Sequence, residues 1–316
     1  MNFEGRDLNV RIWDSPMRQL GLFLRAAQPR ANAWGCPYNT LEIVHFAFAA
    51  LEDKTGPTGA LMKILTGGCR VFSPEDGQLS TLGNWTARTV ISQNSGAQRI
   101  TLTISDYAPG LSPAVVNPRA EEVHYVVGGE GKCRINGFEY LLTSGAAIFV
   151  PPGAVFNVEN TGVETLRLVS SCCPEDPQRH TVDAPLRAAS GEPPLWMVHE
   201  DLREDIRATK DRVFRYLVYT DLGCKQITQF AGWITPSKAP VHYHTYEEGI
   251  FILEGSGVVH TDGGSCEFGP GSSIYFPVGV RHCVENPGTS TIKLLGTFYP
   301  SGSPGEAYEP VEASHS

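Results

Sequence analysis

The stretch 242-HYHTYEEGIFILEG-255 carries the residues that decide both the fold and the site. His242 and His244 stand two apart in it, and Glu248 follows four residues after His244. Residues two apart on a β-strand point to the same face, so both imidazoles should enter the same interior. Glu248 shares this parity and joins them if the strand continues. The stretch therefore predicts two metal-binding histidines on one face of a strand, with Glu248 beside them if that strand continues.

A second stretch, 271-GSSIYFPVGVRHCVEN-286, supplies a third imidazole. His282 follows the tight turn of 277-PVG-279, so it should reach the interior from a separate strand. Three imidazoles and one carboxylate suit a divalent first-row ion such as iron, manganese, nickel, cobalt or zinc. A structural zinc site is closed, whereas four ligands on a six-coordinate ion leave positions open. Without a metal, these buried groups would be poorly paired, at a cost of ~1–3 kcal/mol each. We therefore predict one open metal site.

The chain also repeats itself. An offset of 126 residues places Glu121-Glu122 on Glu247-Glu248. The other matches are mostly turn-forming residues, namely Gly129 with Gly255, Pro151 with Pro277, Gly153 with Gly279, and Asn160 with Asn286. Between them lie runs rich in β-branched and aromatic residues, such as VHYVV, KCRI and AIFVP in the first copy and GIFILEG, GVVHT and SIYFP in the second. This pattern is typical of antiparallel β-structure and predicts two tandem β-barrels.

The second copy resembles the cupin superfamily, whose two signature motifs are G(x)5HxH(x)3,4E(x)6G and G(x)5PxG(x)2H(x)3N. It departs from them at the opening glycine of the first motif, where Pro236 stands. The resemblance implies an all-β protein of two tandem jelly-roll barrels, a bicupin. It also implies that the metal ligands are the residues at the motif positions, namely His242, His244, Glu248 and His282.

We expect five segments along the chain. They are an N-terminal extension over 1–90 packed on a barrel, an N-terminal cupin over 91–175, a linker with a short helix over 176–215, a C-terminal metal-binding cupin over 216–305, and a tail over 306–316. The helix is predicted from the charge pattern of 199-HEDLREDIRATKDRVF-214. Within the extension, the segment 41–53 fits both a helix and a strand.

The first copy has lost the metal ligands. Val116 and Pro118 stand near the places of the His-x-His pair, and Phe156 replaces His282. Only Glu122 remains of the four. We therefore predict a metal-free N-terminal barrel in which Glu122 is a structural remnant.

Other residues of the second copy are weaker candidates for contact with a substrate. They are Tyr243, Tyr246, His260, Trp233, Tyr275 and Arg281. Arg281 would suit a substrate carboxylate, because its guanidinium fork matches that group. Its neighbour His282 points into the barrel, so Arg281 should point away.

The composition limits the partners. The net charge of −9 disfavours nucleic acid, because phosphate binding needs a basic surface. No run of 18 apolar residues occurs, and the start MNFEGRDLNV lacks the pattern of a signal peptide. We therefore expect a cytoplasmic protein that binds no membrane. The 8 cysteines contain no CxxC pair and should be free thiols.

An open metal in an enclosed cavity favours an enzyme. We expect a non-haem dioxygenase (EC 1.13 type) that uses Fe(II) and dioxygen on a small chelating organic substrate, and that forms a homodimer. The alternative is a non-oxidative lyase, decarboxylase, isomerase or amidohydrolase with Mn(II), Ni(II) or Zn(II). A non-enzymatic binding protein is a further alternative. The sequence indicates no general base beyond the metal ligands.

Overall fold

The computed structural model describes residues 62–176, 178–183, 187–304 and 308–310, with side chains up to residue 304. All of them belong to one compact unit, Gly56–Ser316. The predictions for residues 1–61, including the segment 41–53, and for most of the tail lie outside the described residues. The regular secondary structure of the described part is nearly all strand, and its helical elements are the 3-10 turns Thr66–Gly68, Gln93–Ser95, Glu200–Leu202 and Thr220–Leu222. It contains no helix with the length and apolar character needed to span a membrane.

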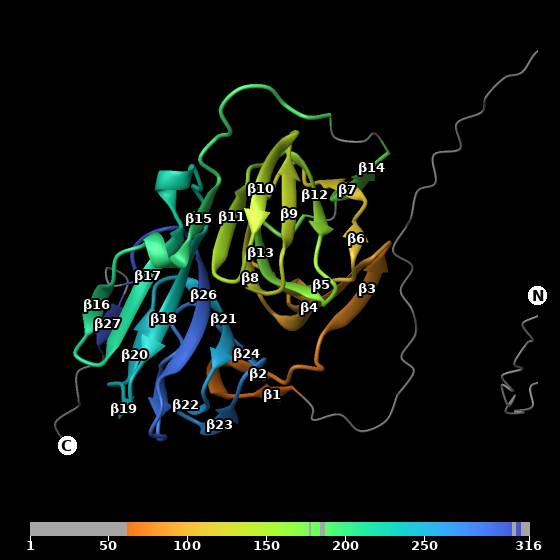
Figure 1. Ribbon diagram of the computed structural model, residues 1–316. Helices are drawn as coiled ribbons and strands as arrows, with labels where there is room; N and C mark the ends of the chain where they lie inside the picture. Colours follow the sequence, from red (N-terminus) through yellow and green to blue (C-terminus); the bar gives the residue numbers. More distant parts are fainter. Residues whose placement is uncertain (1–61, 177, 184–186, 305–307, 311–316) are drawn as a thin grey trace, which may run out of the picture. The chain divides into compact units, whose positions relative to one another are not determined.

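The N-terminal barrel has two antiparallel sheets (Figure 1). One has six strands, in the order β10-β9-β12-β7-β14 with β6 beside β12, and the other has seven, in the order β15-β11-β8-β13-β5-β4-β3. Their bounds are β3 Gln78–Leu82, β4 Trp85–Ile91, β5 Leu102–Tyr107, β6 Gly110–Leu111, β7 Ala114–Val116, β8 Glu121–Gly128, β9 Gly131–Ile135, β10 Phe138–Leu142, β11 Ala146–Val150, β12 Val155–Asn160, β13 Leu166–Cys173, β14 His180–Val182 and β15 Met197–His199. The predicted runs VHYVV and KCRI lie within β8 and β9.

The C-terminal barrel repeats this plan. One sheet has eight strands, in the order β1-β2-β24-β21-β26-β18-β17-β16, and the other has six, in the order β23-β22-β25-β20-β27 with β19 beside β25. Their bounds are β1 Lys63–Ile64, β2 Arg70–Phe72, β16 Ile206–Thr209, β17 Arg212–Val218, β18 Thr228–Ile234, β19 Ser237–Lys238, β20 His242–His244, β21 Glu247–Glu254, β22 Gly257–Thr261, β23 Gly264–Phe268, β24 Ser273–Phe276, β25 His282–Asn286, β26 Ile292–Tyr299 and β27 Tyr308–Pro310. The prediction of two tandem jelly-roll barrels is confirmed.

Each barrel completes a sheet with a strand that precedes the other barrel in the sequence. The strand β2 comes before the N-terminal barrel but pairs with β24, where Arg70 lies opposite Tyr275. The strand β15 comes before the C-terminal barrel but pairs with β11, where His199 lies opposite Ala146. Strands from the predicted extension therefore serve both barrels, because β3 and β4 join the N-terminal one.

Besides the apolar core inside each barrel, one apolar core is shared by both barrels. It combines buried side chains of the N-terminal barrel (Ile91, Ile100, Leu102, Val123 and Phe149) with those of the C-terminal barrel (Leu217, Val218, Ile227, Phe251 and Tyr275). The described cysteines are free, as expected, and they are Cys69, Cys133, Cys172, Cys173, Cys224, Cys266 and Cys283. Burial of apolar surface at ~25 cal/mol per Å² makes this shared core the main link between the barrels.

The first glutamate of the second Glu-Glu pair crosses this interface. The carboxylate of Glu247 accepts hydrogen bonds from the N–H groups of Gln98, Arg99 and Ile100 at 2.8, 2.7 and 3.0 Å. It also accepts one from the Tyr275 hydroxyl at 2.8 Å. Glu247 thus holds a loop of the N-terminal barrel while Glu248, its neighbour on an alternating strand, faces the other way.

Glu121 of the first pair makes the reverse contact. Its carboxylate accepts hydrogen bonds from the N–H groups of Lys225 and Gln226 at 3.0 and 2.7 Å, and from the Cys224 thiol at 3.2 Å. Each loop follows a glycine with a left-handed backbone, Gly96 at φ +89° and Gly223 at φ +90°. Only glycine adopts this conformation at little cost. We call Glu121 and Glu247 the reciprocal clamps.

The linker contains less helix than predicted. Within 199–214, only Glu200–Leu202 is helical, as a 3-10 turn, and it is followed by β16 and the start of β17. The helix expected beyond this turn is therefore wrong. The physical reason is that β17 pairs with β18 along its length and buries Phe214 and Leu217, which outweighs local propensity.

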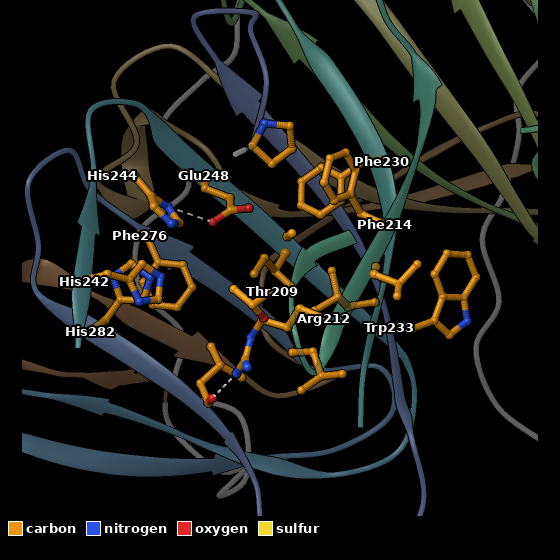
Figure 2. Close-up of a pocket in the computed structure, with 18 of the residues that line it drawn as sticks. Thr209, Arg212, Phe214, Phe230, Trp233, His242, His244, Glu248, Phe276 and His282 are labelled. Atoms are coloured by element: carbon orange, nitrogen blue, oxygen red, sulfur yellow. Dashed lines mark hydrogen bonds and ion pairs between the residues drawn. The ribbon is translucent and has the colours of Figure 1, made fainter. Parts of the chain in front are cut away.

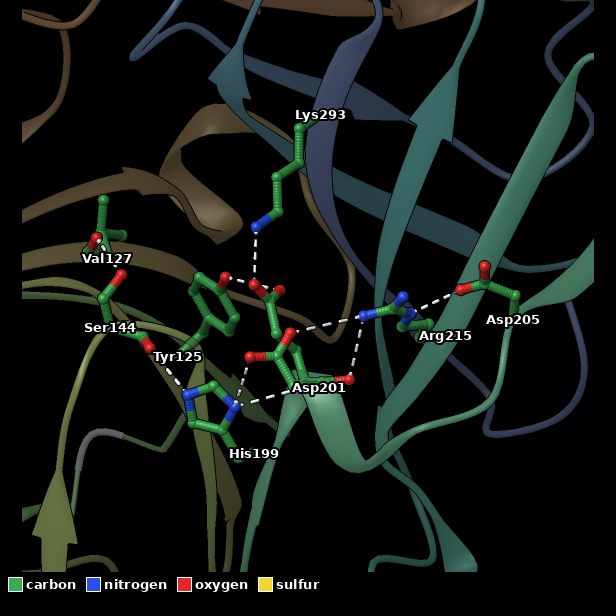
Figure 3. Close-up of polar contacts among 9 residues, drawn as sticks. Tyr125, Val127, Ser144, His199, Asp201, Asp205, Arg215 and Lys293 are labelled. Atoms are coloured by element: carbon green, nitrogen blue, oxygen red, sulfur yellow. Dashed lines mark hydrogen bonds and ion pairs between the residues drawn. The ribbon is translucent and has the colours of Figure 1, made fainter.

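The same turn bridges the barrels through one carboxylate. Glu200 accepts hydrogen bonds from the Tyr125 hydroxyl of the N-terminal barrel at 2.9 Å and from Nζ of Lys293 of the C-terminal barrel at 2.8 Å. Figure 3 shows Tyr125 and Lys293 converging on this point, with Arg215 reaching Asp205 beside it. Polar contacts therefore supplement the shared core on this side of the interface.

Candidate metal centre

Three histidines converge inside the C-terminal barrel. His242 and His244 belong to β20, and His282 begins β25, directly opposite His242 in the pairing of the two strands. One ring nitrogen from each imidazole lies within 4.8 Å of the others. All three side chains are buried, and Figure 2 shows them on the same wall of a cavity. Within the described residues, this is the one His/Cys/Asp/Glu cluster compact enough to hold a metal ion.

Glu248 reaches the histidines from the opposite sheet. It lies on β21, because the chain leaves β20 after His244 and turns through Thr245 and Tyr246. The strand does not continue from the histidines to Glu248, so the condition under which Glu248 would share their strand face is not met. The glutamate nevertheless faces the histidines, with Oε2 at 3.2 Å from Nδ1 of His244.

The contact between His244 and Glu248 fits a cation-binding site. Nδ1 of His244 is buried and has no hydrogen-bond partner among the described residues, although the carboxylate oxygen is within 3.2 Å. Buried polar atoms are nearly always satisfied, so an orphaned nitrogen facing a carboxylate indicates a third participant. Three imidazoles and a carboxylate form a donor set that suits a divalent first-row metal.

Backbone carbonyls fix the other two rings. Nδ1 of His242 lies 2.9 Å from the carbonyl of Pro240, and Nδ1 of His282 lies 2.8 Å from that of Val280. A carbonyl oxygen only accepts, so Nδ1 carries the hydrogen in both rings. The neutral rings therefore present the lone pair of Nε2, as metal-binding histidines do. Phe276 stacks on the His282 ring at 3.9 Å and restricts its rotation.

Burial keeps these imidazoles neutral. It lowers the pKa of His242 to about 4, with His244 as an additional cause. Burial also lowers the pKa of His282 well below its ordinary value, helped by the two neighbouring histidines. A neutral imidazole is the form that binds metals, so His242 and His282 can bind a cation at neutral pH without losing a proton.

The cavity in front of the cluster is mostly apolar. Its volume is about 180 Å³. Most of the aromatic and aliphatic lining comes from the eight-stranded sheet and includes Phe214, Phe230, Trp233, Ile250, Phe276 and Leu294. Besides the four candidate ligands, its polar lining includes Thr209 and Arg212 (Figure 2). The centre thus combines a polar end with a wall suited to a hydrocarbon group.

The weaker candidates from the sequence separate into two groups. Tyr246, stacked on His244 at 4.5 Å, and Trp233 line the cavity. Tyr275 is committed to Glu247 at the barrel interface. The remaining three, Tyr243, His260 and Arg281, are absent from the cavity lining.

His260 and Arg281 have charged partners outside the cavity. Nε2 of His260 lies 2.7 Å from Oε2 of Glu285, and Nε of Arg281 lies 3.5 Å from Oδ2 of Asp262. The side chain of Arg281 is 49% exposed, so it points away from the site, as its position next to His282 suggested.

Arg212 and Phe214 were missed because their segment was interpreted as helical. They stand two apart on β17, and both line the cavity. The signal that could have found them is this alternation, which a strand interpretation of RVFRYLV would have placed on one face.

The N-terminal barrel has an arginine beside its remaining carboxylate. Oε2 of Glu122 lies 3.3 Å from Nη2 of Arg179, and the guanidinium of Arg179 stacks over Trp85 and Phe156. His124 also lies close, with Nε2 at 3.6 Å from Oε2 of Glu122. The buried Glu122 is thus balanced by a protein cation.

Comparison with known proteins gives the same architecture. The cupin domain model matches residues 104–172 and again 234–298. The uncharacterized protein MJ1618 of Methanocaldococcus jannaschii is 36% identical over 96 residues, which are 29% of this chain and 77% of that protein.

Solved structures share the fold at low identity. Oxalate decarboxylase OxdC of Bacillus subtilis has a TM-score of 0.63 at 14% identity, over 80% of each chain. A putative glyoxylate induced protein of Pseudomonas aeruginosa has a TM-score of 0.61 at 19% identity, over 79% of this chain and 96% of the other. From the two domain matches, the related sequence and the two jelly-roll barrels, the chain belongs to the cupin family and contains two cupin domains in tandem.

Proposed function

We propose that the C-terminal barrel binds one divalent metal ion through His242, His244, Glu248 and His282, and that the protein is a metal-dependent enzyme acting on a small organic molecule. The observation that carries this proposal is the convergence of the four side chains, three from one sheet and Glu248 from the other, at one end of an apolar cavity of about 180 Å³. A packing module would need neither the ligands nor the cavity. When bound, the ion would supply a Lewis-acid or redox centre with positions open to substrate.

The surrounding residues orient this site and exclude water. The carbonyls of Pro240 and Val280 hold the protons of two imidazoles away from the cavity, and Tyr246 and Phe276 fix ring orientations by stacking. The apolar lining lowers the local dielectric, which strengthens electrostatic interactions with a bound substrate.

As the reaction class we favour a dioxygenase with Fe(II), in which dioxygen is the co-substrate. The apolar wall supports this choice, because it fits a hydrocarbon body and keeps bulk water from the reacting groups. Non-oxidative decarboxylation with Mn(II) is the second candidate. It is supported by the structural likeness to oxalate decarboxylase, one structure of which concerns its Mn(II) centres.

Metal analysis of the purified chain, followed by reloading with Fe(II) or Mn(II), tests the proposal. We expect one ion per chain, and loss of that ion in His282→Gln but not in the matched control His260→Gln, whose ring is paired with Glu285 outside the cavity. Oxygen consumption with a panel of small acids, catechols and β-diketones would support the dioxygenase. Turnover that persists under anaerobic conditions would favour decarboxylation. Unchanged metal content in His282→Gln would contradict the site.

A further inference from the structure

One cationic side chain enters the cavity in front of the metal centre. Among the described residues that line the cavity, Arg212 is the sole lysine or arginine. Its side chain is 17% exposed. Figure 2 shows it extending from β17 toward the side of the cavity where Phe276 and His282 lie.

Two contacts fix the guanidinium of Arg212. Nη1 lies 2.9 Å from Oδ2 of Asp211, and Nη2 donates to the carbonyl of Val284 at 2.7 Å. Val284 stands two residues after His282 on β25, so the guanidinium is fastened to the strand that carries a metal-site histidine. Asp211 is itself held, because Thr209 donates to its other oxygen at 2.7 Å. The arginine is therefore preorganised.

The contacts with described residues leave donors free. A guanidinium has five N–H groups, and the two bonds above use two of them. The remaining N–H groups belong to a side chain that lines a mostly apolar cavity. In such surroundings, a charge-assisted bond to an anion is about twice as strong as a neutral bond. A role confined to joining β17 and β25 would not require the side chain to border the cavity.

We propose that Arg212 is a specificity-determining residue that binds the carboxylate of an anionic substrate. The apolar body of this substrate lies against Phe214, Phe230 and Leu294, and its reacting end faces the histidines and Glu248. The cavity volume of about 180 Å³ sets the size. A cavity of about 150 Å³ accommodates benzene, so the substrate class is a small carboxylic acid with an apolar body about the size of one ring. The role in turnover rests on the proposed function, whereas carboxylate binding does not.

Binding to the metal-free protein isolates the contribution of Arg212. The full-length chain is stripped with a chelator, and benzoate and the neutral, isosteric benzamide are titrated by calorimetry. We expect a preference for benzoate of about tenfold or more, the equivalent of one charge-assisted hydrogen bond. Arg212→Met should remove the preference while leaving benzamide binding unchanged. Arg281→Met, which alters an exposed arginine outside the cavity, should bind both probes as the wild type does.

The outcomes are distinguishable. Equal loss of both probes in Arg212→Met would mean a collapsed cavity. Arg212→Gln, which keeps a polar but uncharged side chain at this position, must then lose benzoate alone for the proposal to stand. Equal benzoate affinity in Arg212→Met and the wild type would overturn it, as would no benzoate binding by the wild type. Metal content is measured in parallel. A chain that prefers benzoate but takes up no metal would keep this inference and refute the proposed function.

Discussion

The Glu247→Ala substitution tests how firmly the two barrels depend on the reciprocal clamps. Glu247 is 2% exposed and accepts four hydrogen bonds. Gln98 and Arg99 are exposed, so water can replace their bonds, whereas Ile100 and Tyr275 are buried and would be left unsatisfied. Two lost bonds to a charged group, at ~1.5–3 kcal/mol each, predict a decrease of about 3–6 kcal/mol in the free energy of unfolding.

Urea unfolding followed by circular dichroism measures this decrease. Glu267→Ala is the matched control, because Glu267 is exposed on β23 of the same barrel and should cost less than about 0.5 kcal/mol. Glu121→Ala should destabilise in the same way as Glu247→Ala. If Glu247→Ala proves no more destabilising than Glu267→Ala, the interface does not depend on the clamp and the reasoning fails.

Three further predictions concern the metal site, the N-terminal barrel and the linker. Metal at about one hundred times its dissociation constant should stabilise the wild type by about 2.7 kcal/mol and His282→Gln not at all, as measured by thermal unfolding with and without metal. Burial lowers the pKa of His124 to about 4, below its unfolded value of 6.5. As the pH drops, the unfolded chain therefore binds the proton before the folded chain does, and the free energy of unfolding falls between pH 6.5 and pH 4. His124→Ile, which installs the residue found at the equivalent position 250, should flatten this fall in urea titrations at stepped pH, and an unchanged slope would contradict it. Glu200→Gln should lower stability by about 1–2 kcal/mol through its bonds to Tyr125 and Lys293, and a loss no larger than that of Glu267→Ala would argue against a role in joining the barrels.

The repeat of turn-forming residues was enough to predict the two barrels. Glycines such as Gly153 and Gly279 hold positive φ angles at +76° and +75°, which few other residues adopt, so their spacing marks the turns directly. The His-x-His pair was equally informative, because strand alternation alone places His242 and His244 on one face.

The remaining features depend on contacts between distant segments. Glu248 lies opposite the histidines because the chain crosses to the other sheet after His244. The alternation of side chains along one strand cannot predict where the chain makes such a crossing. The exchanged strand β2 and the strand β17, mistaken for helix, are set by their pairing partners. Arg212 was not predicted as a cavity residue because its strand, β17, was predicted as a helix. Local charge patterns cannot reveal which edge of a sheet a segment will join.

The strands β2 and β15 and the reciprocal clamps make equivalent contacts in both directions between the barrels. The interface therefore resembles that of a twofold dimer, in which both partners use the same surface, although it lies within a single polypeptide. The surface that a single-barrel relative would offer to a second copy is therefore already covered here by covalently attached sequence. Association of two chains, which stays a prediction, would have to use a different face. For the same reason, cutting the chain between its halves would expose the apolar core that they share, so the C-terminal half is not expected to be stable on its own.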